Sequence, residues 1–163
     1  MVKIVCQRIP SRFIAHCSNY LHPSHYYMTD ISVALAEIIG QDAEEGLAMV
    51  SDDRLQLKTH LCKKIVDLLE TLAPAETRLR GLLMYELHAA MAETGRRQAL
   101  VDGPMVLLGF VTESRRILLQ SASLLRHEPP ELPEGRLLRQ AKLNLVQMDE
   151  LIKNLSANMP SPL

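Results

Sequence analysis

The sequence predicts an all-α protein made of antiparallel helix hairpins that stack side by side. Leu and Ala dominate the composition and Gly is sparse, with 7 residues, which favours helix over sheet. Apolar residues recur at helical spacing in five separate segments. The last four of these segments begin near residues 52, 74, 104 and 133. This spacing approaches the rhythm of a tetratricopeptide-like (TPR-like) helical array, without its strict period of about 34 residues.

Composition limits the classes of partner. With 163 residues, 47% of them hydrophobic and 23% charged, the chain suits one globular domain with a substantial core. A net charge of −1 supplies no positive field for nucleic acid, and no apolar run reaches the roughly 18 residues of a membrane span. We therefore expect neither nucleic acid nor membrane as a partner. Three cysteines without a convincing secretion signal favour reduced thiols and a cytoplasmic or nuclear location.

The clearest helical pattern lies in residues 74–97, which we predict to be the central helix. Pro74 suits its first turn, and Gly95 is expected to cap its C-terminus. A helix with a wide apolar face needs neighbours to cover that face. The predicted stripe consists of Leu79, Leu82, Leu83, Leu87, Ala90 and Met91.

Two further helices are predicted before this segment. The first covers residues 24–40 and ends at Gly40, and the second follows the capping residue Ser51, with Asp52 and Asp53 in its first turn, and runs to about Leu72. The expected buried stripes are Tyr27, Ile31, Leu35, Ile38 and Ile39 in the first helix, and Leu57, Leu61, Ile65, Leu68 and Leu72 in the second.

Two more helices are predicted after it, separated by an extended Pro-rich linker at residues 128–133. One begins near Pro104, and the last covers residues 133–155. In this division residues 1–22 are an irregular N-terminal arm, residues 23–155 the helical domain, and residues 156–163 a flexible tail. The expected stripes are Leu107, Val111, Ser114, Leu118 and Leu125, then Leu137, Leu138, Ala141, Leu145, Met148, Leu151 and Ile152. Leu118 is expected to face Leu83 and Leu87.

The sequence shows no catalytic pattern. It has no Gly-x-Ser-x-Gly, no Gly-rich phosphate loop and no His-Glu-x-x-His. His60 and Cys62 are two residues apart, so they point to different helix faces, and His88 is expected to be partly buried and bonded to a neighbour. Glu86 and Glu93 lack the partner pair that a di-iron site requires. No cofactor is expected.

A metal or thiol site in the segment from His16 to His25 is an alternative. His16, Cys17, His22 and His25 have tolerable ligand spacing, and Cys6 would complete a tetrahedral zinc site. The segment lacks a Cys-x-x-Cys pair, so ordinary polar residues in an irregular arm are the favoured explanation.

Basic residues on two of the predicted helices indicate a peptide-binding rim. Lys58 lies one position from the stripe residue Leu57, which places it off the core, and Lys63 follows on the same helix. With Arg78 these residues would bind an acidic peptide or a C-terminal carboxylate. The alternative is a solvated charged face, which is the usual situation of exposed Lys and Arg.

Three strings resemble the C-terminal helical domain of arthropod SET-and-MYND (SMYD-type) lysine methyltransferase-like proteins. They are LHPSHYYMTDIS at residues 21–32, RLRGLLMYELHAAM at 78–91, and EPPELPEGRLLRQAKLNLVQMDELI at 128–152. The last is the most specific, since it joins an extended Pro-Pro turn to a Pro-Glu-Gly helix start. The resemblance covers roughly residues 20–155 of the chain.

The resemblance implies a TPR-like domain that packs against a catalytic SET domain, helps to wall its substrate cleft and binds partner peptides. The parent enzyme would transfer a methyl group from S-adenosylmethionine to a protein lysine. This chain lacks the MYND cysteines, the SET Asn-His motif and the post-SET cysteines. We therefore expect a non-catalytic protein-interaction domain, which is a fragment, a mis-predicted gene model or a paralogue reduced to its tail. A free-standing helical adaptor unrelated to methylation is the second hypothesis.

Overall fold

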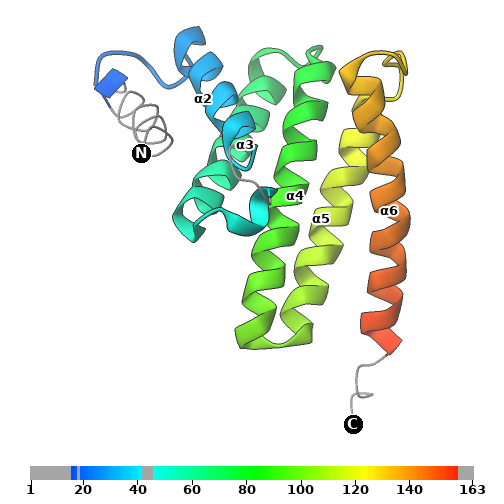
Figure 1. Cartoon of the computed structure of the whole chain (residues 1–163). Helices are drawn as coiled ribbons and strands as arrows, with labels where there is room; N and C mark the ends of the chain where they lie inside the picture. Colours follow the sequence, from blue (N-terminus) through cyan, green and yellow to red (C-terminus); the bar gives the residue numbers. More distant parts are fainter. Residues whose placement is uncertain (1–15, 18, 42–45, 158–163) are drawn as a thin grey trace.

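The computed structural model describes residues 16–17, 19–41 and 46–157, and this part of the chain is an all-helical array (Figure 1). It contains no strand in the described ranges, so the predicted fold class is confirmed. Five α-helices match the five predicted segments, and one short 3-10 helix precedes the second of them. The elements are α2 (Tyr26–Ile38), η1 (Gly46–Met49), α3 (Asp52–Leu72), α4 (Thr77–Asp102), α5 (Pro104–Leu124) and α6 (Pro133–Ala157).

Helix α4 is the centre of the array. Each helix packs against the next one in the chain, and α4 also contacts α2 and α6 (Figure 1). The main core cluster joins α2, α3 and α4, and Ile117 adds a contribution from α5. None of the described helices is both long and apolar enough to cross a bilayer.

Two predicted ends of the central helix are wrong. Pro74 precedes the helix, which begins at Thr77 after Glu76, whose carboxylate accepts the Leu79 N–H at 3.3 Å. Gly95 does not end the helix, because α4 continues to Asp102 and stops only at Gly103, where φ is +87°. A positive φ favours glycine, whereas the buried Gly95 lies against Phe110 of α5, where a side chain would collide.

Several predicted core positions are exposed. Tyr27, Ile38 and Leu72 lie on the surface, and Met28 and Ser32 are buried in their place on α2. Helix α2 is at the edge of the array and packs mainly against α3, so the position of α3 decides which side of α2 is covered. In α6, Leu151 is exposed, and the buried apolar residues are Leu138 and Ala141.

The α5 residue that joins Leu83 and Leu87 in the main cluster is Ile117. Leu118 is fully buried but lies outside that cluster. Adjacent helical residues point about 100° apart, so a difference of one position changes the neighbour that a side chain meets.

Candidate functional site

The predicted basic rim is not assembled, because Lys58 is buried. Its side chain is 1% exposed. Its Nζ donates to the carbonyl oxygens of Ala36 at 2.6 Å and Ile39 at 2.9 Å, and to Glu86 Oε2 at 2.5 Å. The expectation that Lys58 lies off the core is therefore wrong. Burial of an ammonium is tolerated here because three oxygen atoms accept hydrogen bonds from its N–H groups.

The other two residues of the predicted rim lie on different surfaces. Lys63 is exposed on α3. Arg78 is exposed at the start of α4, and its Nε donates to Glu134 Oε1 of α6 at 2.7 Å. That hydrogen bond holds α4 against α6 and raises the pKa of Arg78. Neither Lys63 nor Arg78 is among the hydrogen-bond partners of the buried network around Lys58 Nζ.

The histidine segment at the start of the described chain has local structural roles. His22 Nδ1 lies 2.6 Å from Ser24 Oγ, and His25 caps α2 by accepting the Tyr27 N–H at 3.3 Å. No grouping of three or more metal-ligating side chains occurs within the described ranges. Cys6, the proposed fourth ligand, lies outside the described residues.

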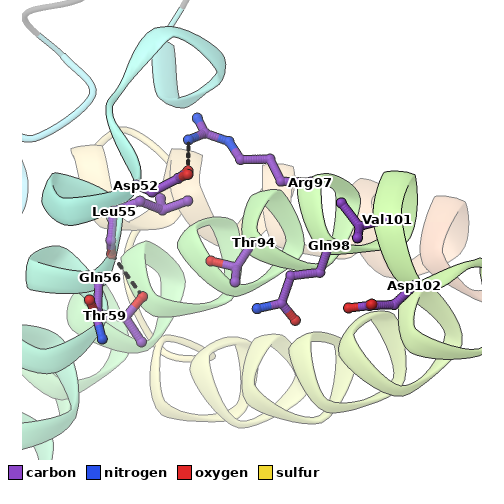
Figure 2. Close-up of a pocket in the computed structure, with 9 residues that line it drawn as sticks. All are labelled: Asp52, Leu55, Gln56, Thr59, Thr94, Arg97, Gln98, Val101 and Asp102. Atoms are coloured by element: carbon purple, nitrogen blue, oxygen red, sulfur yellow. Dashed lines mark hydrogen bonds and ion pairs between the residues drawn. The ribbon is translucent and has the colours of Figure 1, made fainter.

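A groove with a volume of about 610 Å³ lies between the N-terminal half of α3 and the C-terminal half of α4 (Figure 2). Each helix contributes one face, because its lining residues follow the i, i+3, i+4, i+7 spacing. From α3 these are Asp52, Leu55, Gln56 and Thr59, and from α4 they are Thr94, Arg97, Gln98, Val101 and Asp102. We call this feature the α3–α4 groove.

The groove exists because α4 continues past the first turn of α3. An ion pair between Arg97 and Asp52, the first residue of α3, sets these two positions level with each other. Five residues of α4 follow Arg97, which corresponds to roughly 7.5 Å of helix at 1.5 Å per residue. The last turn of α4 therefore extends beyond the beginning of α3 and leaves its own face uncovered.

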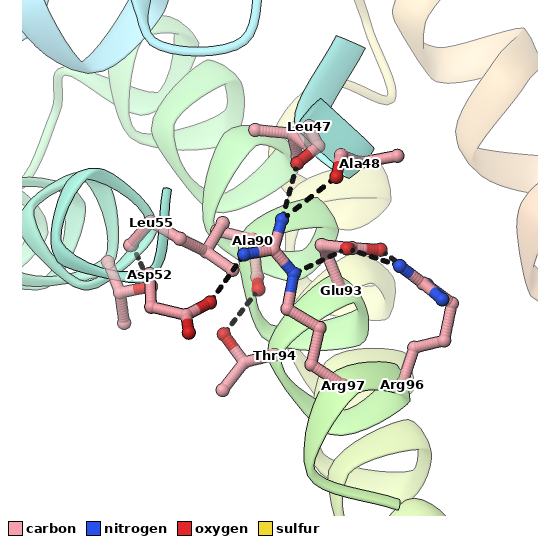
Figure 3. Close-up of polar contacts among 10 residues, drawn as sticks. Leu47, Ala48, Asp52, Leu55, Ala90, Glu93, Thr94, Arg96 and Arg97 are labelled. Atoms are coloured by element: carbon pink, nitrogen blue, oxygen red, sulfur yellow. Dashed lines mark hydrogen bonds and ion pairs between the residues drawn. The ribbon is translucent and has the colours of Figure 1, made fainter. Parts of the chain in front are cut away.

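Arg97 fixes one wall of the groove (Figure 3). Its Nε donates to Glu93 Oε1 at 2.7 Å, and its two terminal nitrogens bond Asp52 and the carbonyl oxygens of Leu47 at 3.0 Å and Ala48 at 3.2 Å. Hydrogen bonds from Arg96 and then from Arg97 lower the pKa of Glu93. The guanidinium thus joins η1, α3 and α4, and each of its three nitrogens donates to an acceptor within the protein.

Three other polar side chains of the groove are open to a ligand. Gln56, Gln98 and Asp102 are exposed, and none of them makes a hydrogen bond or ion pair among the residues that the structure describes. Thr59 and Thr94 donate their hydroxyl protons to backbone oxygens of their own helices. Leu55 is buried at the base of the groove, and Val101 is 86% exposed.

The buried titratable groups lie elsewhere, in the helical core. His88 is buried and its Nδ1 is bonded to the Tyr85 carbonyl oxygen, as expected, and burial lowers its pKa to about 4. Burial also raises the pKa of Cys62 to about 12, so its thiol stays protonated and is a poor nucleophile. These groups serve the packing of the core, and the α3–α4 groove offers binding chemistry.

The groove residues are not among the site residues that the sequence predicts. Asp52 is predicted only as a residue of the first helical turn, and Gln56 and Gln98 belong to no predicted site. One signal was present: Asp52, Gln56 and Thr59 form a polar i, i+4, i+7 strip on α3. Such a strip is also what an ordinary solvated face shows, so the signal becomes informative only when α4 is placed beside it.

Comparison with known proteins identifies no relative. No protein-family model, no curated protein and no solved structure matches the chain. The geometry of the α3–α4 groove is therefore the basis on which a function can be proposed.

Proposed function

We propose that this chain is a non-catalytic helical protein-interaction domain and that the α3–α4 groove holds an extended segment of its partner. The observation that carries the proposal is the pair of facing helices whose Gln56 and Gln98 amides line one open groove (Figure 2). A carboxamide offers both donors and an acceptor. It can therefore match the N–H and the C=O of a peptide backbone, which an extended peptide must satisfy on binding.

The size and composition of the groove support this proposal. Its volume of about 610 Å³ is within the range of roughly 300–1,000 Å³ typical of ligand sites. Leu55 and Val101 supply apolar surface between the polar residues, as binding sites commonly do. Arg97 and its four acceptors hold the η1 side in place, and a preformed wall lowers the entropic cost of binding.

The proposal includes a relationship to SMYD-type lysine methyltransferases, which rests on three strings in the sequence. In that case the chain corresponds to the helical domain beside a catalytic SET domain, and its partner is a protein. The alternative is a free-standing helical adaptor. Sequencing the transcript upstream of the present reading frame separates the two: SET and MYND coding sequence supports the relationship, and an unrelated or untranslated upstream region supports the adaptor.

The non-catalytic part of the proposal predicts that the chain alone does not bind S-adenosylmethionine. The Asn-His motif that the family uses for the methyl donor is absent from the sequence. Isothermal titration calorimetry with micromolar S-adenosylmethionine should therefore show only the heat of dilution. Saturable binding would contradict a purely interacting role.

Peptide selection tests the groove itself. A random peptide library displayed on phage is selected against the wild-type protein, and one selected peptide is synthesised for fluorescence polarisation. Gln98→Trp places a large side chain in the groove at an exposed position and should weaken binding at least tenfold. Gln147→Trp makes the same change at an exposed α6 position outside the groove and should leave the affinity unchanged. Failure to select any peptide, or equal weakening by both variants, would overturn the proposal.

A further inference from the structure

We propose that the α3–α4 groove selects a partner segment carrying a Lys or Arg side chain, which docks on Asp102. This inference rests on the proposed peptide-binding function and adds the chemical class of the ligand. It reverses the acidic partner expected from the sequence, because the basic rim on which that expectation rested is not assembled.

The charged residues of the groove favour a basic ligand. Its lining contains three charged residues: Asp52, Arg97 and Asp102. Asp52 and Arg97 form an ion pair, and Arg97 also bonds Glu93 and two backbone carbonyls. The Asp102 carboxylate has no such partner within the described part of the chain. The ligand-facing charge of the groove is therefore negative.

The position of Asp102 on its helix strengthens this field. Asp102 is the last residue of α4, where the helix dipole places partial negative charge and where an acidic side chain is unfavourable for the helix itself. The last carbonyls of a helix also lack intrahelical partners. Gly103 N–H satisfies the Ala99 carbonyl, and a ligand cation beside Asp102 would meet both the carboxylate and the helix terminus. Charge-assisted hydrogen bonds of this kind are the stronger ones.

The neighbours of Asp102 suit a long basic side chain. Val101 lines the groove beside it and is 86% exposed. Lys and Arg pack their aliphatic stems along apolar surface while their charged ends stay at a polar group. Gln98, one turn earlier on the same side of α4 (Figure 2), is placed to bond the peptide backbone that carries this side chain. Val101 thus offers apolar surface to the aliphatic stem, Gln98 offers an amide to the peptide backbone, and Asp102 offers a carboxylate to the charged end.

The experiment uses the same phage library, with the random segment held between fixed Ser-Gly flanks so that no free terminus contributes a charge. Selection is carried out against wild type, Asp102→Asn and Asp102→Lys. Wild type should enrich Lys or Arg at one position of the random segment. Asp102→Asn should lose this enrichment, and Asp102→Lys should enrich Asp or Glu at the same position.

A wild-type-selected peptide then provides the quantitative test. Its affinity should fall at least tenfold with Asp102→Asn, and replacing its enriched basic residue by Gln should cause a similar loss in wild type and little further loss in the variant. Asp53→Asn is the matched control, because Asp53 is an exposed acid on the first turn of α3 that does not line the groove. That variant should bind as wild type does.

The outcomes separate this inference from the function on which it rests. Peptides that bind in the groove, as shown by their sensitivity to Gln98→Trp, but carry no preferred basic residue would overturn the role of Asp102 and leave the peptide-binding function standing. Selection of no peptides, or of peptides insensitive to Gln98→Trp, would overturn both.

Discussion

A single side chain, Lys58, joins three helices. The carbonyl oxygens that it contacts, those of Ala36 and Ile39, lie at the C-terminus of α2, where helix carbonyls have no intrahelical partner. Lys58 therefore caps α2 from α3, and its contact with Glu86 extends the network to α4. A buried cation is stable in this position because the helix terminus and the carboxylate both compensate its charge.

Replacing Lys58 should destabilise the whole fold. Lys58→Met leaves two carbonyls and the Glu86 carboxylate without their donor, and we expect a loss of roughly 3 kcal/mol in the free energy of unfolding, near the lower end for a broken buried ion pair. The lower end applies because the Glu86 side chain is 25% exposed and regains water. Urea denaturation measures the change. Lys63→Met, at an exposed position of the same helix, should change stability by less than about 0.5 kcal/mol, and equal effects of the two variants would show that Lys58 is not buried in solution.

His88 should make stability depend on pH. Its pKa in the folded state is about 4, below the ordinary value of about 6.5, so the unfolded chain binds a proton that the folded chain does not. Protonation of His88 in the unfolded chain therefore lowers the free energy of unfolding as the pH falls. The effect is absent above about pH 6.5 and reaches about 3 kcal/mol at about pH 4.

Unfolding free energies measured from pH 7 to 4 test this dependence. Carboxylates also titrate near pH 4, so the relevant quantity is the difference between wild type and variant. His88→Gln should show a shallower decline than wild type, whereas His60→Gln, at an exposed position, should follow the wild-type curve. An NMR titration in which the His88 ring protonates near pH 6.5 would contradict the prediction.

Among the described helices, α4 and α5 make the most extensive contact, and this contact depends on small residues. Gly95 lies against Phe110, and Gly81 is so close to Leu125 that an added Cβ would lie 2.7 Å from its side chain. Two buried hydroxyls reinforce this contact: Ser114 Oγ donates to the His88 carbonyl at 2.7 Å, and Ser121 Oγ to the Gly81 carbonyl at 2.6 Å. Small side chains let the two backbones approach, and the two hydroxyls add hydrogen bonds to α4 carbonyls across the contact.

Two glycines of this hairpin should respond oppositely to the same substitution. Gly95→Ala gains about 1 kcal/mol of helix propensity but forces the new methyl group into Phe110, and overpacking typically costs about 1–3 kcal/mol. We expect net destabilisation. Gly109→Ala, in α5 with nothing within 4 Å of the new Cβ, should stabilise by up to about 1 kcal/mol. Thermal unfolding followed by circular dichroism measures both, and stabilisation by Gly95→Ala would show that the helices are farther apart.

For the whole molecule, the shared core of α2, α3 and α4 makes folding depend on α4. Leu83 and Leu87 are buried in the cluster to which all three helices and Ile117 of α5 contribute. A domain with one such cluster is expected to unfold as a unit. The α3–α4 groove depends on this arrangement, since its two walls belong to helices that are held together by the same core.

Truncation of the α4 core should therefore lower the stability of the entire domain. Leu83→Ala and Leu87→Ala should each cost about 2–5 kcal/mol, which is a large part of the stability of a typical domain. Leu143→Ala, at a 60% exposed position of α6, is the control and should have little effect. Melting followed by circular dichroism reports the result, and an unchanged melting temperature in the two core variants would refute the assignment of this face.

Local sequence patterns are sufficient to predict the five helices and several of their ends. Asp52 in the first turn of α3, Pro104 in α5 and Pro133 in α6 were placed correctly, because capping, dipole and proline effects act within a few residues. Periodicity also identified α4 as central and Leu83 and Leu87 as buried. These features require only local information, since helical spacing depends on residues three or four positions apart.

Which side of each helix is covered, and where the groove lies, depends on contacts between helices. Lys58 is buried against acceptors in α2 and α4. These acceptors lie 19 to 28 positions away in the sequence, so local spacing does not reveal them. Arg97 and Asp52, which set α4 against α3, are 45 positions apart. Gly95 carries the local signal of a helix end, yet α4 continues through it because Phe110 of the next helix packs against its bare Cα. Contacts at such separations depend on how whole helices are placed, and a pattern of local spacing contains no record of that placement.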